Sequence, residues 1–364
     1  MEQVSEPFTI DLRRLTVLRE LQRRGSLART AEALHLTPSA VSQQIAALAR
    51  ETGVPLTEKD GRGVRLTGQA RVLLAHADAI AAQLERARSD LGAYGEGGRG
   101  SVTIGCLSSA ILGLLPGVLR ALADRLPQVR VDVVESEPPD LFTALDAGQV
   151  DVAVAVHFAA APPHTDARYS RTELFTDVMD IAVPAGHRLA GRERVALREL
   201  AAEAWIVGDA RSCVGAVARS VCATAGFTPD IRHAVNDWGA LAALVEAGQG
   251  VALVPRLVRP AYASRRLALL RVEGDPPPSR HLFAAVRAGA EADAVLGVVL
   301  DQLRTNARAQ TDFPNSRSRT SQASASASTR SRPRPEVDSG SKDLATGRPG
   351  EPSATSTSTP FSPS

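Results

Sequence analysis

The sequence predicts a helical N-terminal region, one long connecting helix and a larger α/β region. Within residues 11–66, apolar residues recur at helical spacing in three short segments. Residues 68–94 continue that spacing without interruption. From residue 101 onward, short apolar runs rich in Val, Ile and Ala alternate with helical segments, which is typical of βαβ units on a mostly parallel sheet.

Composition limits the class of protein further. The formal net charge of the 364 residues is only +2, with a slightly basic start and a slightly acidic stretch over 100–305. This distribution fits a DNA-binding domain attached to a body that does not touch DNA. The sequence offers no signal-peptide pattern and no apolar run of the roughly 18 residues that a membrane span needs. Three cysteines argue against a secreted disulfide framework, so we expect a cytoplasmic protein.

The first two predicted helices are short and amphipathic. In residues 11–24, the expected buried stripe comprises Leu12, Leu15, Leu18 and Leu21. The second helix follows Ser26, and its expected apolar face comprises Ala28, Ala31 and Leu34. A tight break at His35 and Leu36 then separates it from a third helix.

The third helix carries the clearest functional signal. Thr37 can cap it through the side-chain hydroxyl, and Pro38 suits the first helical position. Its core face is expected to be Val41, Ile45 and Leu48. The opposite face is small and polar with a single charge, and it comprises Ser39, Ser42, Gln43, Ala46, Ala47 and Arg50. Such a face suits insertion into a DNA major groove, although two helices that merely pack together would give a similar pattern.

A basic turn follows the third helix in the run GRGVRLT at 61–67. Glycines on both sides of Arg62, with Arg65 close behind, predict a wing that presents two guanidinium groups to phosphate. We therefore expect base contacts from Ser39, Ser42 and Gln43, of which Gln43 suits an adenine edge. The predicted phosphate-contacting positions are Ser26, Thr37, Arg62 and Arg65, and Pro38 is a further expected DNA-binding position.

The long helix over 68–94 shows a heptad seam. Its apolar positions alternate in steps of four and three, and they are Leu73, Ala77, Ile80, Leu84, Ala87 and Leu91. Because the segment lies between two globular regions, we expect the seam to meet a second copy of the chain and form a dimer. An amphipathic helix packed on its own domain is the alternative. The glycine-rich run at 95–100 predicts a hinge.

These motifs together resemble the LysR-type transcriptional regulators of bacteria. The similarity runs from DLRRLTVLRELQRRGSLARTAEALHLTPSAVSQQIAALARETGVPL through GRGVRLT, GQVDVAVAV and EAGQGVALVP to about Leu303. One departure is Thr57, where the family usually has an aromatic residue, so we expect looser packing of the wing.

The resemblance implies a winged helix-turn-helix domain over 1–66, a dimerisation helix over 67–95 and a hinge over 96–101. It also implies an effector-binding domain over 102–305 with the two-lobed α/β fold of type II periplasmic binding proteins. We expect lobe I at 102–160 plus 267–305, lobe II at 165–265, and crossovers near 157–169 and 262–267. Residues 306–364 are rich in Ser, Thr, Pro and Arg, which predicts a disordered tail.

The effector site is expected between the lobes. Ser108 and Ser109 follow a predicted strand and open a helix, where hydroxyls and free backbone N–H groups suit a carboxylate. Simple capping is the alternative, and the resemblance implies that this loop contacts a small molecule, for which an organic acid is one candidate. From lobe II we expect Ser212, Cys213 and Trp238 to contribute, with Trp238 as either a cleft wall or core. The Glu137-Pro138 pair is a weaker candidate.

Cys213 and Cys222 have eight residues between them, a spacing also found in peroxide-sensing members of the resembled family. On one continuous helix their Cα atoms lie about 13 Å apart, too far for a disulfide without unfolding. We therefore favour two small buried thiols and keep a redox-sensing regulator as the alternative.

Catalytic motifs are missing from the sequence. The seven histidines show no metal-ligand spacing, and neither a nucleophile elbow nor a phosphate-binding loop is present. We expect no enzyme activity, cofactor or metal. The expected partners are double-stranded DNA, a small-molecule effector, further copies in a homodimer or homotetramer, and RNA polymerase. A two-lobed solute-binding protein or enzyme is the alternative of a different class, because the fold also serves those functions.

Overall fold

A computed structural model describes residues 9–61, 63–94, 100–209, 212–262, 266–274 and 276–311. Arg62, most of the expected hinge and the expected tail beyond residue 311 lie outside these residues. The last helix, α10 (Ala294–Thr311), continues past residue 305, where the sequence led us to expect the end of the domain. It continues because Leu303 and Ala307 are buried in the same core cluster as the apolar side of α6 (Leu115–Arg125).

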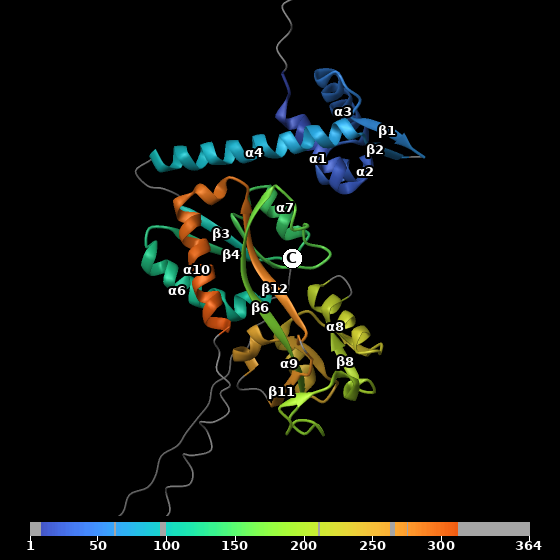
Figure 1. Cartoon of the computed structure of the whole chain (residues 1–364), viewed down its shortest axis with the longest axis vertical. Helices are drawn as coiled ribbons and strands as arrows, with labels where there is room; N and C mark the ends of the chain where they lie inside the picture. Colours follow the sequence, from blue (N-terminus) through green and yellow to red (C-terminus); the bar gives the residue numbers. More distant parts are fainter. Residues whose placement is uncertain are drawn as a thin grey trace, which may run out of the picture. The chain divides into compact units, whose positions relative to one another are not determined.

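The N-terminal domain contains α1 (Leu12–Arg24), α2 (Leu27–Ala33), α3 (Pro38–Thr52) and a hairpin of β1 (Thr57–Asp60) and β2 (Gly63–Leu66) (Figure 1). Two expected core positions are wrong. Leu12 is 45% exposed, and Ala28 is exposed, because the core positions are taken by Val17 on α1 and by Thr30 and Ala31 on α2. Thr57 is only partly buried, and Leu56 and Leu66 anchor the hairpin instead.

The long helix α4 (Gly68–Tyr94) is continuous, but its first turns are packed on the N-terminal domain and its later apolar side chains are exposed. Its first turns pack on the N-terminal domain through Ala70, Leu74 and Ala77, which are buried in that domain's core. Farther along, Ile80, Leu84 and Leu91 are 43%, 54% and 74% exposed. The predicted seam is therefore partly used within the chain itself, and only its second half is open to a partner.

Lobe I is built on a sheet in which β4 (Arg130–Glu135), β3 (Ser101–Cys106) and β5 (Val152–Val156) run parallel. β12 (Ser279–Arg287) pairs antiparallel with β5, and the first part of β6 (Tyr169–Pro184) pairs antiparallel with β12. The expected helix at 112–126 is broken at Leu114 into α5 (Ser108–Gly113) and α6. Helix α7 (Asp140–Asp146) covers one face of the sheet, and α6 and α10 pack in the cluster on the other (Figure 1).

Lobe II continues from the second part of β6. That part pairs with β10 (Ala252–Pro255) and with β11 (Leu267–Val272), which in turn pairs with β7 (Arg194–Val195). Two further strands, β8 (Ala204–Val207) and β9 (Asp230–Ala234), pair with each other. The helices are α8 (Cys213–Thr224), α9 (Trp238–Glu246) and the 3₁₀ segments η1 (Leu197–Leu200) and η2 (Arg256–Tyr262).

The two lobes are joined inside long strands and not at the expected loops near 157–169 and 262–267. β6 pairs with β12 up to Val178, and from Met179 it pairs with β10 and β11. β11, expected to belong to lobe I, therefore lies in lobe II. In Figure 1, β6 and β12 run side by side from one lobe into the other. Over the described residues, no helix is both long and apolar enough to cross a membrane.

Candidate functional site

Helix α3 is held in a defined orientation by its two ends and its core face. The Thr37 hydroxyl accepts a hydrogen bond from the Ala40 N–H at 3.1 Å, and Pro38 occupies the first turn. Val41 and Leu48 have no exposed surface and Ile45 only 4%, in the same cluster as Leu18 and Ala31. Since three core residues on one face fix the rotation of the helix, the opposite face has a defined set of side chains.

That opposite face is open to solvent. Ser39, Ser42 and Gln43, the three positions expected to contact bases, are all exposed. Ala46 and Arg50 extend the same face by two further turns. An exposed row of short hydroxyl and amide side chains leaves room for the helix to approach base edges, where these groups can donate and accept hydrogen bonds.

The expected phosphate-contacting residues fall into two kinds. Ser26 and Thr37 are helix caps: the Ser26 hydroxyl accepts from the Arg29 N–H at 3.3 Å, so each of the two hydroxyls still has its own hydrogen to donate. Arg65 lies on the hairpin, 59% exposed, and pairs with Glu58 at 3.3 Å. An exposed pair of this kind is weak, so phosphate can compete for Arg65. Arg62 lies outside the described residues.

Between the lobes, a buried guanidinium joins several elements. Arg280 on β12 donates to both Asp177 on β6, at 3.0 and 2.9 Å, and the Ser109 hydroxyl at the start of α5, at 2.7 Å. The side chains of Arg280 and Asp177 are 3% and 1% exposed. Asp177 also accepts the Leu257 N–H at 3.0 Å, so the pair connects both crossover strands to both lobes.

Cys213 completes this group from lobe II. Its thiol lies close enough to Arg280 to feel the guanidinium charge, and its backbone N–H lies near the Glu137 carboxylate of lobe I. Burial raises the pKa of the Cys213 thiol to about 11, outweighing the opposite effect of the nearby Arg280 charge. Burial also raises the pKa of Glu137, while the Cys213 N–H acts to lower it. A carboxylate of the chain itself therefore lies at the N-terminus of α8, where the sequence suggested a place for a ligand carboxylate.

The remaining expected effector residues have different surroundings. Ser108 is half-buried at the first position of α5. Ser212 caps α8, accepting from the Gly215 N–H at 3.0 Å and donating to the Asp209 carbonyl at 3.0 Å. Trp238 is 2% exposed in the core of lobe II, and its indole N–H has no hydrogen-bond partner among the described residues. The structure thus brings Ser109 and Cys213 together around Arg280 and places Trp238 in a core cluster.

Sequence reasoning missed Asp177 and Arg280. Each is a charged residue inside a strand-like apolar run, DVMDIAVP for Asp177 and SRHLFAAV for Arg280. A charge in such a run must find a partner when it is buried, and that signal could have singled out both residues. Their pairing with each other could not have been found this way. In the described part of the chain, His, Cys, Asp and Glu form no group of three able to hold a metal ion.

Two protein-family models match this chain, and its relatives are transcriptional regulators. Residues 12–71 match the family described as bacterial regulatory helix-turn-helix protein, lysR family, and residues 95–308 match the LysR substrate binding domain. A probable hydrogen peroxide-inducible genes activator of Mycobacterium avium is 28% identical over 264 residues, covering 72% of this chain and 83% of that protein. The transcriptional dual regulator GltC of Bacillus subtilis is 29% identical over 246 residues, covering 68% and 81%.

Among solved structures, a cysteine mutant of OxyR from Corynebacterium glutamicum superposes with a TM-score of 0.54 at 21% identity, covering 84% of this chain and 94% of that one. At this level of identity the superposition shows a common fold. The two-lobed α/β domain behind a helix-turn-helix domain, which the sequence predicted, is confirmed.

Proposed function

The chain belongs to the LysR family of DNA-binding transcriptional regulators with an effector-binding domain, and on that premise we propose how its own residues act. Ser39, Ser42 and Gln43 of α3 read base edges in the major groove, while Ser26, Thr37, Arg62 and Arg65 position the protein on the phosphate backbone. Pro38, in the first turn of α3, is a further DNA-binding position. A small molecule bound between the lobes changes these DNA contacts. The observation that carries the proposal is the exposed polar face of α3 opposite its buried Val41–Ile45–Leu48 face.

In vitro selection with the full-length chain tests this proposal. A random pool of duplexes, enriched over several rounds, is expected to converge on a site with two-fold symmetry, because two recognition helices of a dimer face symmetric half-sites. A pool that stays random would contradict sequence-specific reading. The selected duplex then serves as the probe in every later binding measurement.

The exposed seam on α4 supports a dimer, and a second copy of the chain is the occupant that we propose. Ile80, Leu84 and Leu91 follow one another at spacings of four and seven, as in a two-stranded coiled coil.

Near the start of the helix, an open groove of about 620 Å³ is lined by Thr52, Val54, Gly68, Gln69, Val72, Leu73 and His76. The 60% exposed side chain of Val72 leaves this groove partly apolar.

Leu84→Glu is therefore expected to weaken dimerisation, because a charge placed in an apolar seam must be desolvated. We expect the dimer dissociation constant to rise about tenfold or more, the equivalent of about 1.4 kcal/mol. Sedimentation equilibrium measures the change. Gln83→Glu adds the same charge at the next exposed position and should leave the constant within about twofold. Equal effects of the two variants would exclude this face of α4.

The effector is proposed to bind beside Ser108, at the start of α5, and Cys213, at the start of α8. Arg280 lies between these elements, but Asp177 already neutralises it, and Glu137 adds a further carboxylate. An organic acid would therefore have to compete with Glu137 for the region beside the Cys213 N–H. A thermal-shift screen of small acids, amino acids and aromatic compounds with the full chain, repeated on Ser108→Ala, tests the site. A compound that stabilises both chains equally binds elsewhere.

A peroxide-responsive regulator is the second candidate, and the positive charge of Arg280 near the Cys213 thiol favours it. A guanidinium beside a thiol stabilises the thiolate that reacts with peroxide. Several relatives are named hydrogen peroxide-inducible genes activators, which supports the same idea. Against it, Cys213 and Cys222 are both buried on α8, and burial raises the pKa of each thiol to about 11.

The pH dependence of oxidation tests this candidate. A thiol whose pKa is about 11 is almost entirely protonated at pH 7, so its oxidation rate should rise about tenfold for each pH unit between 7 and 9. Mass spectrometry of peroxide-treated protein measures the rate at each cysteine, with buried Cys106 as the control. A rate at Cys213 that is fast at pH 7 and flat with pH would instead establish an activated thiolate and favour peroxide sensing.

A further inference from the structure

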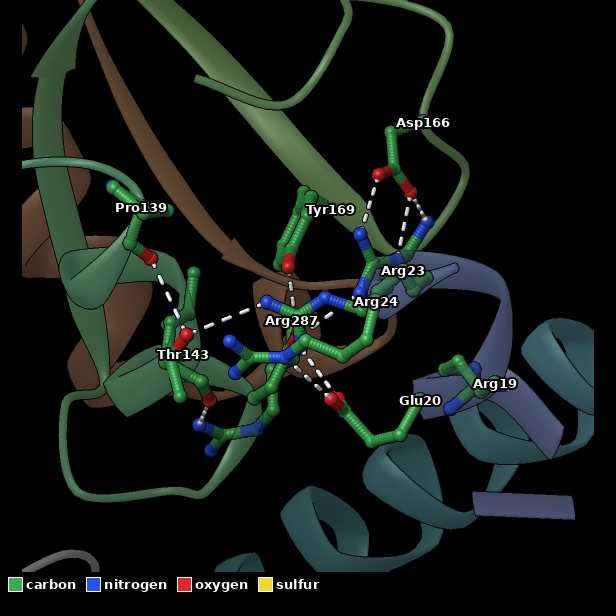
Figure 2. Close-up of polar contacts among 12 residues, drawn as sticks. Arg19, Glu20, Arg23, Arg24, Pro139, Thr143, Asp166, Tyr169 and Arg287 are labelled. Atoms are coloured by element: carbon green, nitrogen blue, oxygen red, sulfur yellow. Dashed lines mark hydrogen bonds and ion pairs between the residues drawn. The ribbon is translucent and has the colours of Figure 1, made fainter. Parts of the chain in front are cut away.

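Helix α1 of the N-terminal domain makes polar contacts with lobe I (Figure 2). Arg23 donates to Asp146 at 3.1 Å and to the Thr143 hydroxyl at 3.3 Å, both on α7. Glu20, one turn earlier on α1, accepts from Arg23 at 2.7 Å and holds it in place. The side chains of Arg23 and Asp146 are only 21% and 26% exposed, so this pair is partly shielded from solvent.

Lobe I presents Asp146 through contacts of its own. Asp146 accepts the Tyr169 hydroxyl at 2.7 Å and pairs with Arg168 at 2.9 Å. A carboxylate that is already oriented by two partners costs little further side-chain entropy when it binds Arg23. The contact therefore joins α1 to a preformed acceptor.

Helix α4 makes a second contact with the same lobe. Glu85 pairs with Arg287 at 3.0 Å, and both side chains are 14% exposed. Arg287 also donates to the carbonyls of Leu145 and Val150, so it is fixed within lobe I. Less exposed pairs of this kind contribute more than exposed ones, because water screens them less.

A third contact involves backbone alone. Gly289, just before η3 (Ala290–Ala292), has a φ of +95°, and a Cβ at this position would overlap the Ala82 carbonyl oxygen of α4. The two backbones are thus too close for any side chain at this position. This close approach does not depend on charge, so it is independent of the two ion pairs.

We propose that α4 and α1 dock on lobe I of the same chain through this docking surface, and that the docking transmits the state of the effector cleft to α3. The residues of the docking surface are Arg23, Ala82, Glu85, Thr143, Asp146, Arg287 and Gly289. The transmission part rests on the proposed function, whereas the docking part does not.

The connectivity of the molecule supports such a route. Glu137, whose carboxylate lies near the Cys213 N–H of lobe II, lies three residues before α7, the helix that carries Thr143 and Asp146. Arg23 lies on α1, whose buried Leu18 belongs to the same core cluster as Val41 and Ile45 of α3. Asp78 of α4 pairs with Arg19 and lies within the electrostatic influence of Arg168 of lobe I. A displacement of Glu137 can thus reach α3 through packed elements.

Hydrogen exchange of the full-length chain tests the docking without DNA or effector. In Arg23→Ala/Glu85→Ala, peptides covering α7 and residues 287–292 are expected to exchange about three- to tenfold faster, since two partly shielded ion pairs are lost. Both substitutions leave the internal contacts of lobe I intact. Arg13→Ala/Asp90→Ala removes the same two charge types from exposed positions of α1 and α4 and should change exchange less than twofold. If both double variants exchange alike, the docking proposal is wrong.

A pair of glycine variants repeats the test without changing charge. Gly289→Ala is expected to speed exchange in peptides covering residues 78–90 of α4, because a methyl group would push the Ala82 carbonyl away. Gly226→Ala, at a similar φ of +87° with no atom within 4 Å, controls for the backbone strain alone. Equal exchange over residues 78–90 in both variants would refute the close approach.

The transmission part is measured with the selected duplex. Arg23→Ala and Arg13→Ala each remove one positive charge from α1, so any difference between their DNA dissociation constants does not come from net charge. A difference of about threefold or more is expected from the loss of docking. If exchange changes but the two constants agree, lobe I docks without influencing α3, and the transmission part is overturned.

Discussion

Arg280→Met is expected to lower the free energy of unfolding by about 3–5 kcal/mol, the largest effect of any single substitution considered for this protein. The reason is that Asp177 is 1% exposed and burial already raises its pKa, so without the Arg280 guanidinium it must either carry an unpaired charge in the core or take up a proton, and both cost stability. Ser109 would lose a hydrogen-bond donor at the same time. Urea unfolding of the full chain measures the change as a shift in midpoint.

Two further variants show whether the loss of stability comes from the buried ion pair between Arg280 and Asp177. Arg232→Met removes an arginine that pairs with Asp230 at 2.7 Å on the surface, 64% and 55% exposed, and should cost no more than about 0.5 kcal/mol. Arg280→Met/Asp177→Leu removes both buried charges and should recover part of the lost stability, less the cost of the Leu257 N–H left without its acceptor. If Arg280→Met is as mild as Arg232→Met, the buried pair does not stabilise the junction of the lobes.

Gln43→Ala is expected to weaken binding of the selected duplex by about 5- to 100-fold, corresponding to about 1–3 kcal/mol, and to relax the preference at one base pair. The physical reason is that a Gln amide both donates and accepts at an adenine edge, and alanine can do neither. Arg65→Ala should instead weaken binding to all duplexes alike and reduce the slope of log affinity against log salt by about 1. Fluorescence anisotropy at several salt concentrations, with matched and mismatched duplexes, separates the two behaviours.

Gln44→Ala is the matched control for Gln43. Gln44 is the same residue type one position along α3, and its amide oxygen accepts a hydrogen bond from Arg14 at 3.2 Å. Because Gln44 is directed toward α1, its loss should leave base preference unchanged. If Gln43→Ala and Arg65→Ala change affinity and salt dependence in the same way, the assignment of base reading to Gln43 and phosphate binding to Arg65 is wrong.

The helices of the N-terminal domain were predicted well because capping and apolar periodicity depend only on residues close together in the sequence. The Thr37 cap, the position of Pro38 and the Val41, Ile45 and Leu48 face of α3 all follow from contacts within one or two helical turns. The errors at Leu12 and Ala28 have a local origin too. Both lie in the first turn of a helix, where spacing alone does not say whether a neighbouring element covers the side chain.

The interlobe group could not be predicted in the same way. Asp177 and Arg280 are 103 residues apart and meet only because β6 and β12 pair in a register that sets Val178 opposite Ser279. The sequence suggested loops as the crossovers because alternating βαβ units normally end at loops, and it gives no sign that one strand serves both lobes. The capping role of Ser212 and the core position of Trp238 likewise depend on neighbours that are distant in the chain.

By itself, the amino-acid sequence determined the family, the order of helical and α/β regions and the exposed polar face of α3, because caps and periodicities act over a few residues. Only the tertiary structure decided which charges are buried between the lobes and which part of α4 is covered. It also decided that Arg23 meets Asp146 across 123 residues of chain. Such contacts depend on how elements that are distant in the sequence pack and on the register of their strands. Neither can be inferred from the residues next to Arg23 or Asp146 in the sequence.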